Sequence, residues 1–445
     1  MSTGDRRSAL VAVRAEATVR AKLERLSAGG TPETATGGAV DGRSADASDG
    51  QRRADELLAR IAWSRIAEPG DGVAGALLAV AGAGAALEML VRGLSPARFS
   101  AEAASAGVEL DAATVRAALS RWTPRLDRSG TLRDIDRALD AGLRIVVPGD
   151  AFWPVALADL GAHQPTALWL RGEASLLRTP ALSVVGARAA TDYGTRVTAE
   201  IVTGICGAGL AIVSGAAYGI DAVAHRTALA AAAPTVAVLA GGADRAYPAA
   251  HKTLLDRIAA DGAVCAEMAP GSAPTRWRFL QRNRIIAALS GATLVTEAGM
   301  RSGTLNTAGH AASLGRPLGA VPGPVTSAAS AGCHRLIREY AAALVTNAAE
   351  ACELLALGDG LDLMIGAGVA DEATDGSTGS RESSLHRRVL DSLPLRGGRS
   401  ISEASRRAGL GLDEVRGALA ELELLGRVSR RDSPGSGEPL WGLVR

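Results

Sequence analysis

Short apolar runs alternate with helix-length segments between residues 181 and 350, and this alternation constrains the fold more than any other feature. Such uninterrupted apolar runs are typical of parallel strands whose sheet is covered by helices on both faces. The six runs are Leu182–Gly186, Leu210–Gly215, Thr235–Gly241, Ala263–Glu267, Thr293–Glu297 and Leu318–Gly323. They predict an α/β fold with a doubly wound, mostly parallel, Rossmann-like sheet over residues 146–357. Ligands of such sheets bind beyond the carboxyl ends of the strands.

The segments before this region have a different character. Residues 1–55 carry few large apolar side chains, so we expect a helix only near 12–26 and disorder over 28–51. Residues 56–145 show the apolar spacing of helices without the alternation of strands, which predicts a small helical domain.

Two further units are expected after the sheet. Residues 358–384 are rich in Gly, Ala, Asp, Ser and Thr, as flexible linkers are. Residues 385–445 predict three helices followed by a basic hairpin, the pattern of a winged helix-turn-helix. Its role stays open between reading duplex DNA and binding a protein.

A cluster of two arginines around an asparagine stands at Arg282, Asn283 and Arg284, directly before an apolar run. This arrangement predicts the first turn of a helix, where free backbone N–H groups favour anions. Guanidinium groups make forked contacts with phosphate oxygens. Two residues apart, the arginines cannot face the same direction on a helix. We therefore expect one to bind a phosphate-bearing ligand and the other, with Asn283, to fix the local fold.

Glycine-rich turns follow several of the predicted strands. Gly215 and Gly219 would let backbone amides approach a ligand, with Ser214 as a further donor. In the same turn we expect Asp221 to cap a helix and His225 to be buried and hydrogen-bonded.

The other turns carry further candidates for anion binding. Arg188 follows the first strand, Gly242 the third, and Ser302, Gly303 and Thr304 form a cradle after the fifth. Lys252 is the only lysine of the central region. Tyr247 could stack on a base or pack in the core, and Glu297 could be catalytic or structural.

Several classes of function are disfavoured. There is no G-x-G-x-x-G dinucleotide fingerprint, no P-loop and no nucleophile with a matching base, so we expect no catalytic set, cofactor or metal. Four scattered cysteines fit a reducing cytoplasm, and the longest uncharged run, 73–87, fits a buried helix better than a membrane span. The net charge of +1 means that any nucleic-acid binding must come from a local patch.

Taken together, the motifs resemble the DNA-processing protein A (DprA/Smf) family. The segments that carry the resemblance, in the family's order, are Val185–Arg188, Ser214–His225, Gly242–Pro248, Phe279–Ala287, Glu297–Ala308 and Val321–Gly323. The resemblance implies an extended Rossmann-like domain that binds single-stranded DNA, forms homodimers and delivers the strand to the RecA recombinase. It also implies a SAM-like helical domain before the core and a winged helix after it.

The residues and the resemblance together define one expected site. The expected DNA contacts are Arg188, Ser214, Gly215, Gly219, Gly242, Lys252, Arg282, Asn283, Arg284, Ser302, Gly303 and Thr304. The alternative is an enzyme similar to nucleoside-monophosphate phosphoribohydrolases, with Glu297 as the catalytic acid. Those enzymes carry a P-G-G-x-G-T-x-x-E loop, which this chain lacks.

Overall fold

The computed structural model describes residues 17–27 and 43–356, and in the C-terminal part residues 386, 389–390, 392–394, 397–408, 410–424, 427–431 and 439–444. The chain forms two compact units, Met1–Gly368 and Val369–Arg445. The predicted linker at 358–384 lies outside the described residues.

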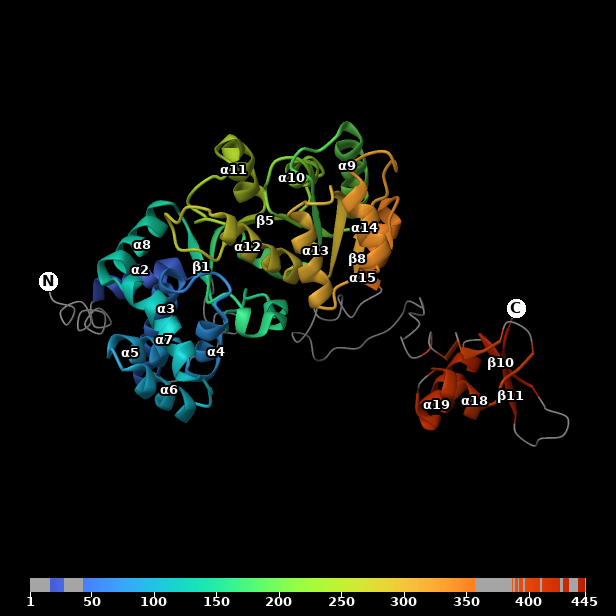
Figure 1. Ribbon diagram of the computed structural model, residues 1–445, viewed down its shortest axis with the longest axis horizontal. Coiled ribbons are helices and arrows are strands. Elements are labelled where there is room, and N and C mark those ends of the chain that lie inside the picture. The colour runs from blue at the N-terminus through green and yellow to red at the C-terminus, as the bar shows by residue number, and fades with distance from the viewer. Residues whose placement is uncertain are drawn as a thin grey trace. The chain divides into compact units, whose positions relative to one another are not determined.

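The larger unit is built on a nine-stranded sheet with the order β1-β2-β6-β5-β4-β3-β7-β8-β9 (Figure 1). Its parallel strands are β3 (Ala181–Gly186), β4 (Ala211–Ser214), β5 (Thr235–Leu239), β6 (Ala263–Ala266), β7 (Ala292–Glu297), β8 (Leu318–Ala320) and β9 (Ala343–Leu344). Two antiparallel strands, β1 (Arg144–Val146) and β2 (Leu168–Gly172), extend one edge. The mostly parallel sheet is confirmed, and the six predicted runs coincide with β3 to β8.

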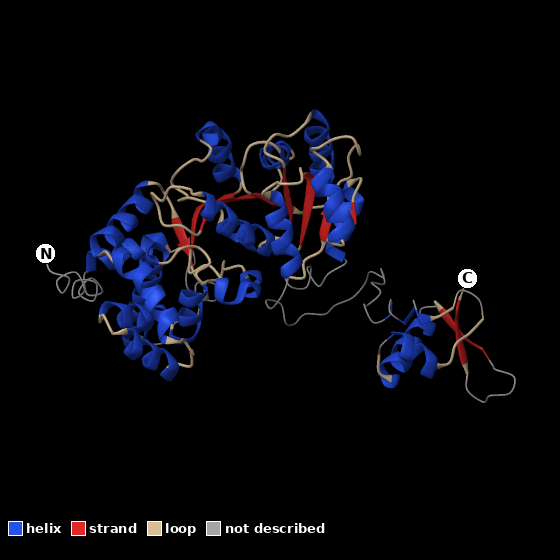
Figure 2. Ribbon diagram, viewed as in Figure 1, coloured by secondary structure: helices blue, strands red, loops and turns tan. Residues whose placement is uncertain are grey.

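Helices cover both faces of this sheet (Figure 2). Alternate side chains of β3 point to opposite faces: Leu182 and Val184 join one apolar cluster, and Ala181 and Val185 join the other. The first cluster includes side chains of α9 (Asp192–Gly207), α10 (Ile220–Ala230) and α15 (Ala348–Ala356). The second includes α12 (Arg276–Ala288), α13 (Thr304–Ser313) and α14 (Ala331–Glu339). The doubly wound fold follows from this two-sided burial.

A helical region precedes the sheet. It comprises α3 (Arg43–Ile66), α4 (Gly72–Ala81), α5 (Ala83–Val91), α6 (Pro96–Ser105), α7 (Ala112–Trp122), the 3-10 turn η2 (Thr123–Arg125) and α8 (Arg128–Asp140). Its core holds Trp63 edge-on to Trp122, with ring centroids 5.2 Å apart. No single helix within the described residues could span a membrane, and the apolar pair α4 and α5 is bent by 114°.

The N-terminal extension differs in part from its prediction. Because α3 begins at Arg43, the end of the stretch expected to be disordered is helical. The buried turns from Ala54 onward anchor that helix, and a helix once nucleated extends at low cost. The expected helix near 12–26 corresponds to α2 (Ala17–Leu26), whose Val19, Leu23 and Leu26 are buried beside α8 and β1.

The smaller unit contains α18 (Ile401–Ala408), α19 (Leu412–Leu424) and an antiparallel pair, β10 (Val428–Arg431) and β11 (Leu440–Leu443). Val415, Leu419 and Leu422 of α19 pack with Trp441 in its core. Two of the three predicted helices and the hairpin are present, which is consistent with the predicted winged helix; the first predicted helix, 385–393, lies partly outside the described residues.

Candidate nucleic-acid interface

A groove of about 460 Å³ lies at the carboxyl ends of β3 and β7. The chain runs outward from β3 through β4, β5 and β6, and β7 then returns to the other side of β3. The groove therefore occupies the point where the strand order reverses, which is the ligand site of doubly wound sheets. Its walls are the turn 186–188 after β3, the loop 299–304 after β7, and α12.

One face of α12 lines this groove. Phe279, Arg282, Asn283 and Ile286 are three or four residues apart, which places them on one side of a helix, and all four are lining residues. Their placement confirms that the arginine cluster faces a strand-end groove on only one side.

The prediction that the cluster forms the first turn of its helix is wrong. The helix begins at Arg276, where the hydroxyl of Thr275 accepts a hydrogen bond from the Arg278 amide at 3.3 Å. Arg282 and Arg284 lie well inside the helix, so its free N-terminal amides do not join their side chains. The residues before Phe279 carry a polar N-cap signal, which the apolar run after Arg284 obscured.

Arg282 is a buried cation with one buried donor that has no partner among the described residues. The residue is 6 % exposed, Nη1 donates to the Val238 carbonyl at 2.6 Å, and Nε is buried without a partner among the described residues. Burial lowers the pKa of Arg282 to about 10, although the charge of Asp221 opposes the shift, so the guanidinium remains charged at neutral pH. Because Arg282 lines the groove, an anion there would offset the cost of burying its charge.

Asp221 is the acidic residue of the groove lining. Its Oδ2 accepts hydrogen bonds from the amides of Gly215 at 3.2 Å and Ala217 at 3.4 Å. Burial raises the pKa of Asp221, and the charge of Arg282 opposes that rise. The carboxylate thus fixes the turn before α10, whereas we expected it to cap the helix itself.

An aromatic ring separates two of the groove's arginines. The guanidinium carbons of Arg188 and Arg282 lie 5.0 and 5.8 Å from the Phe279 ring centroid, within the range of cation–π attraction. Arg188 is exposed, as is Arg301 on the loop after β7, and neither forms an ion pair with a described residue. Tyr247, left open between stacking and core, is half exposed with its ring 5.4 Å from that of Phe279.

The expected cradle after β7 also lies in the groove. Ser302, Gly303 and Thr304 are lining residues. The Thr304 hydroxyl donates to the Gly186 carbonyl at 2.8 Å and accepts from the Ser302 hydroxyl at 2.9 Å, which ties this loop to the end of β3. Asn283 reaches across to the same side, donating to Asn306 Oδ1 at 3.1 Å.

Other predicted contacts are engaged inside the protein. The Ser214 hydroxyl is fully buried and donates to the Val184 carbonyl at 2.6 Å. The amide of Gly242 donates to the Ser272 carbonyl at 3.0 Å, and that of Gly215 is held by Asp221. Gly219, with φ of +74°, packs so closely on the Ala187 carbonyl that a Cβ would lie 2.2 Å from it. The donors of Ser214, Gly215 and Gly242 are thus already engaged within the protein, and Gly219 shapes its turn.

Lys252 lies outside the groove. It begins α11 (Lys252–Asp261), its side chain is 75 % exposed, and its ammonium pairs with Asp256 at 2.6 Å. Lys252 stood out in the sequence because the other basic residues of this region are arginines or histidines, and it does not share the groove with Arg282.

Arg284 takes the structural role that we expected for one of the two arginines. It forms a forked ion pair with Glu267, with Nη1–Oε2 and Nη2–Oε1 distances of 2.9 and 2.8 Å, and its Nε donates to the His163 carbonyl at 2.9 Å. All three guanidinium nitrogens of Arg284 are hydrogen-bonded and the residue is 2 % exposed, so it stabilises the fold behind the groove.

His225 is buried and hydrogen-bonded, as predicted, with Nδ1 2.8 Å from the Thr235 hydroxyl. Burial, with the neighbouring charge of Arg282, lowers its pKa from 6.5 to about 3. Between these values the unfolded chain binds a proton that the folded chain does not, so stability falls as pH drops through this window.

We expect the variant His225→Asn, whose amide can still reach Thr235, to lose less stability in acid than the parent. The difference in slope should reach up to about 1.4 kcal/mol per pH unit below pH 6.5. Urea unfolding at several pH values measures it, and parallel curves for the two proteins would contradict the assignment.

Glu297 holds a helix start. Its carboxylate accepts from the Thr191 amide at 2.9 Å and the Thr191 hydroxyl at 2.6 Å, just before α9, and it does not line the groove. This geometry favours the structural interpretation of Glu297 over the role of a catalytic acid.

The charged and aromatic lining residues that were missing from the predicted contacts are Phe279, Arg301 and Asp221. Phe279 and Arg301 each belong to a motif that carries the family resemblance. Their places along the chain, relative to Arg282 and to the end of a strand, could have identified them. Phe279 precedes Arg282 by three residues on one helix face, and Arg301 stands in a strand-end turn.

The chain is similar in sequence and in structure to known proteins. A family model described as DNA recombination-mediator protein A matches residues 144–356. A Mycobacterium tuberculosis protein named as a DNA processing protein DprA is 44 % identical over 336 residues, which cover 71 % of this chain and 83 % of that protein. The DNA processing protein DprA of Streptococcus pneumoniae is 43 % identical over 183 residues, 41 % of this chain and 64 % of that protein. An X-ray structure of DprA from that species aligns with a TM-score of 0.54 and 29 % identity, covering 67 % of this chain and 96 % of the other.

Proposed function

We propose that this chain, which belongs to the DNA recombination-mediator protein A family, binds single-stranded DNA in the groove between the ends of β3 and β7. The observation that carries the proposal is Arg282, a buried, charged guanidinium that lines the groove and whose Nε has no partner among the described residues. Exposed Arg188 and Arg301 add two cations to the same groove, against the single carboxylate of Asp221. Phosphate oxygens satisfy such donors, and a partly exposed aromatic ring such as Phe279 can stack on the unpaired bases of a single strand.

The wider role of the protein is also part of this proposal. The bound strand is delivered to the RecA recombinase, in natural transformation and other homologous recombination, by a homodimer in the cytoplasm. The family's description as a recombination mediator and its relatives' names as DNA processing proteins support this role. The cysteines are free thiols, which fits a reducing compartment.

Binding should depend on salt through the groove arginines. For labelled oligo-dT, each of the variants Arg188→Gln and Arg301→Gln should bind more weakly, and the slope of log affinity against log salt should shrink by roughly 0.7 per lost phosphate contact. Fluorescence anisotropy at four salt concentrations measures both quantities.

Lys252→Gln is the matched control because it removes the same charge from an exposed site outside the groove. Its slope should equal that of the parent. The proposal fails if the parent binds oligo-dT no better than duplex DNA, or if all three variants change affinity equally.

A further inference from the structure

The face of α12 opposite the groove is occupied by the helical region. Arg278, Gln281 and Arg284 are three residues apart and lie on the side of the helix away from Phe279 and Asn283. Each of these three side chains meets either the loop that joins α3 to α4 or a residue bonded to that loop. A single helix thus contacts the groove on one face and the helical region on the other.

Glu68, in the loop after α3, forms an ion pair with Arg278. Its two carboxylate oxygens accept from Arg278 Nε at 3.0 Å and Nη2 at 2.8 Å, a forked pair in which the Arg278 side chain is only 15 % exposed. Arg125 of η2 pairs with the same carboxylate. Although burial alone would raise it, these hydrogen bonds and charges lower the pKa of Glu68, so the carboxylate stays ionised at neutral pH.

The neighbouring Gly70 fits against the same helix face. Its φ is +71°, and a Cβ at this position would lie 2.4 Å from Gln281 Oε1. Its carbonyl is 2.9 Å from His163 Nδ1, and the carbonyl of His163 accepts from Arg284. The loop therefore bonds to Arg278 directly and to Arg284 through one residue.

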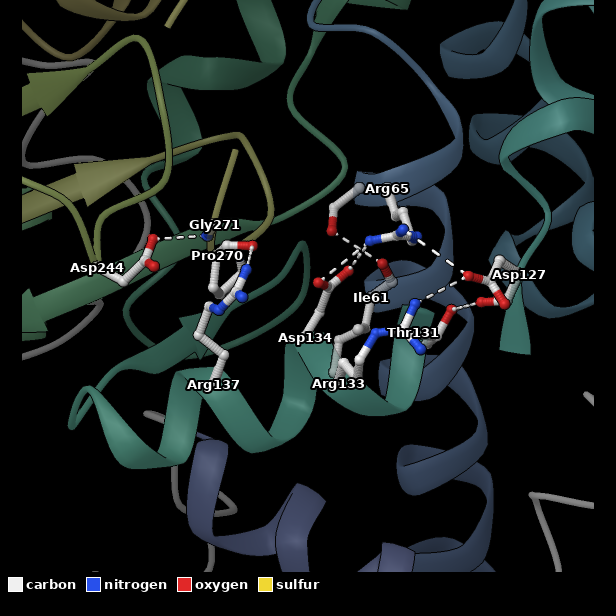
Figure 3. A network of polar contacts seen from close by, with 11 residues as sticks. Ile61, Arg65, Asp127, Thr131, Arg133, Asp134, Arg137, Asp244, Pro270 and Gly271 are labelled. Carbon is white, nitrogen blue, oxygen red and sulfur yellow. Dashed lines mark hydrogen bonds and ion pairs between the residues drawn. The ribbon is translucent and has the colours of Figure 1, made fainter. Parts of the chain in front are cut away.

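A third contact holds the segment that leads into α12. Figure 3 shows Arg137 of α8 directed at the Pro270 carbonyl, 3.5 Å away, and the Gly271 amide donating to Asp244 Oδ1 at 2.8 Å. A Cβ on Gly271 would lie 1.5 Å from Arg137 Nη1, so the arginine packs directly on this backbone. The same α8 is fixed to α3 by the pair of Arg65 and Asp134.

We propose that the helical region is a working part of the strand-binding site, and that Glu68 and Arg278 are positioning residues that set the rotation of α12. This inference rests on the proposed function, because it assumes that Arg282 and Phe279 contact the strand. The ion pair fixes the helix from behind, and the groove face then presents both side chains at the ends of β3 and β7. Neither Glu68 nor Arg278 lines the groove.

The sign of one substitution separates positioning from simple electrostatics. Glu68→Gln removes a negative charge, and removal of a negative charge should strengthen binding of a polyanion if the residue has no other role. Positioning predicts the reverse: affinity for oligo-dT falls roughly three- to tenfold, while the salt slope is unchanged because no phosphate contact is lost. Glu102→Gln is the matched control, since it removes the same charge from an exposed ion pair between Glu102 of α6 and Arg92 at the end of α5, and neither residue lies on α12.

Hydrogen exchange without DNA gives a second readout. In Glu68→Gln the amides of residues 276–284 should exchange faster than in the parent, and those of α9 should not. The double variant Glu68→Gln/Arg278→Gln should bind oligo-dT no more weakly than the weaker single variant, because both changes break one interaction.

Two results would overturn the inference: affinity in Glu68→Gln that equals or exceeds that of Glu102→Gln, or unchanged exchange in 276–284. A parent that binds no oligo-dT would instead refute the proposed function, and the exchange experiment would still report on the hold of Glu68 over α12.

Discussion

Arg284→Gln should lower the free energy of unfolding of the larger unit by about 3–5 kcal/mol at neutral pH. The substitution leaves the carboxylate of Glu267 buried without its forked partner, and the side chains of the pair are now only 3 % and 11 % exposed. It also removes the donor to the His163 carbonyl. Glutamine can replace one of these hydrogen bonds but not the charge. Urea unfolding followed by circular dichroism measures the loss.

Two further variants decide whether the buried charge is the cause. Arg92→Gln breaks an exposed ion pair with Glu102 and should cost less than about 1 kcal/mol. Glu267→Gln/Arg284→Gln should be more stable than Arg284→Gln alone, because two amides leave no isolated charge in the interior. If Arg284→Gln is no less stable than Arg92→Gln, the pair behind the groove is not a major element of the fold.

The sheet could be predicted because its physics is local. Each of β3 to β8 is an apolar run bounded by a turn, so burial on both faces is legible in the sequence itself. The strands that escaped prediction lack that signal. β1 and β9 have three and two residues, and β2 ends in Arg171 and Gly172 at the antiparallel edge. Such short edge strands are specified by their partners rather than by their own residues.

The candidate site was predictable in outline and not in detail. Strand ends and helix spacing placed Arg188, Arg282 and Thr304 near one another, because the topology brings the ends of β3 and β7 together. Sequence cannot show where a donor's hydrogen bond goes. In the sequence Ser214 looked as free to bind a ligand as Ser302, yet its hydroxyl donates to the Val184 carbonyl. Arg284 looked equivalent to Arg282, yet it is saturated by Glu267, which lies in the preceding strand-end turn.

Arg282→Gln should weaken binding of oligo-dT roughly 10- to 100-fold, the largest loss among the groove variants. A charge-assisted hydrogen bond contributes about 1.5–3 kcal/mol, and Arg282 holds its charge at the groove from a buried position. Arg188 and Arg301 are exposed, so water and salt screen their attraction for phosphate, and the loss of either should weaken binding less. Equilibrium titration at a fixed salt concentration measures the ranking, and thermal melting checks that the variant is folded.

Gly215→Ala tests the same contact without changing charge. A Cβ on Gly215 would lie 1.8 Å from Arg282 Nη1, so the guanidinium must leave its place or the turn must move. If the position of Arg282 is what binds the strand, this single methyl group should reproduce most of the affinity loss of Arg282→Gln while the salt slope stays closer to that of the parent. Gly207→Ala is the matched control, because no atom lies within 4 Å of a Cβ there and the residue, at the end of α9, does not line the groove. Equal affinities for Gly215→Ala and Gly207→Ala would show that the net charge of the groove, rather than the placement of one buried arginine, governs binding.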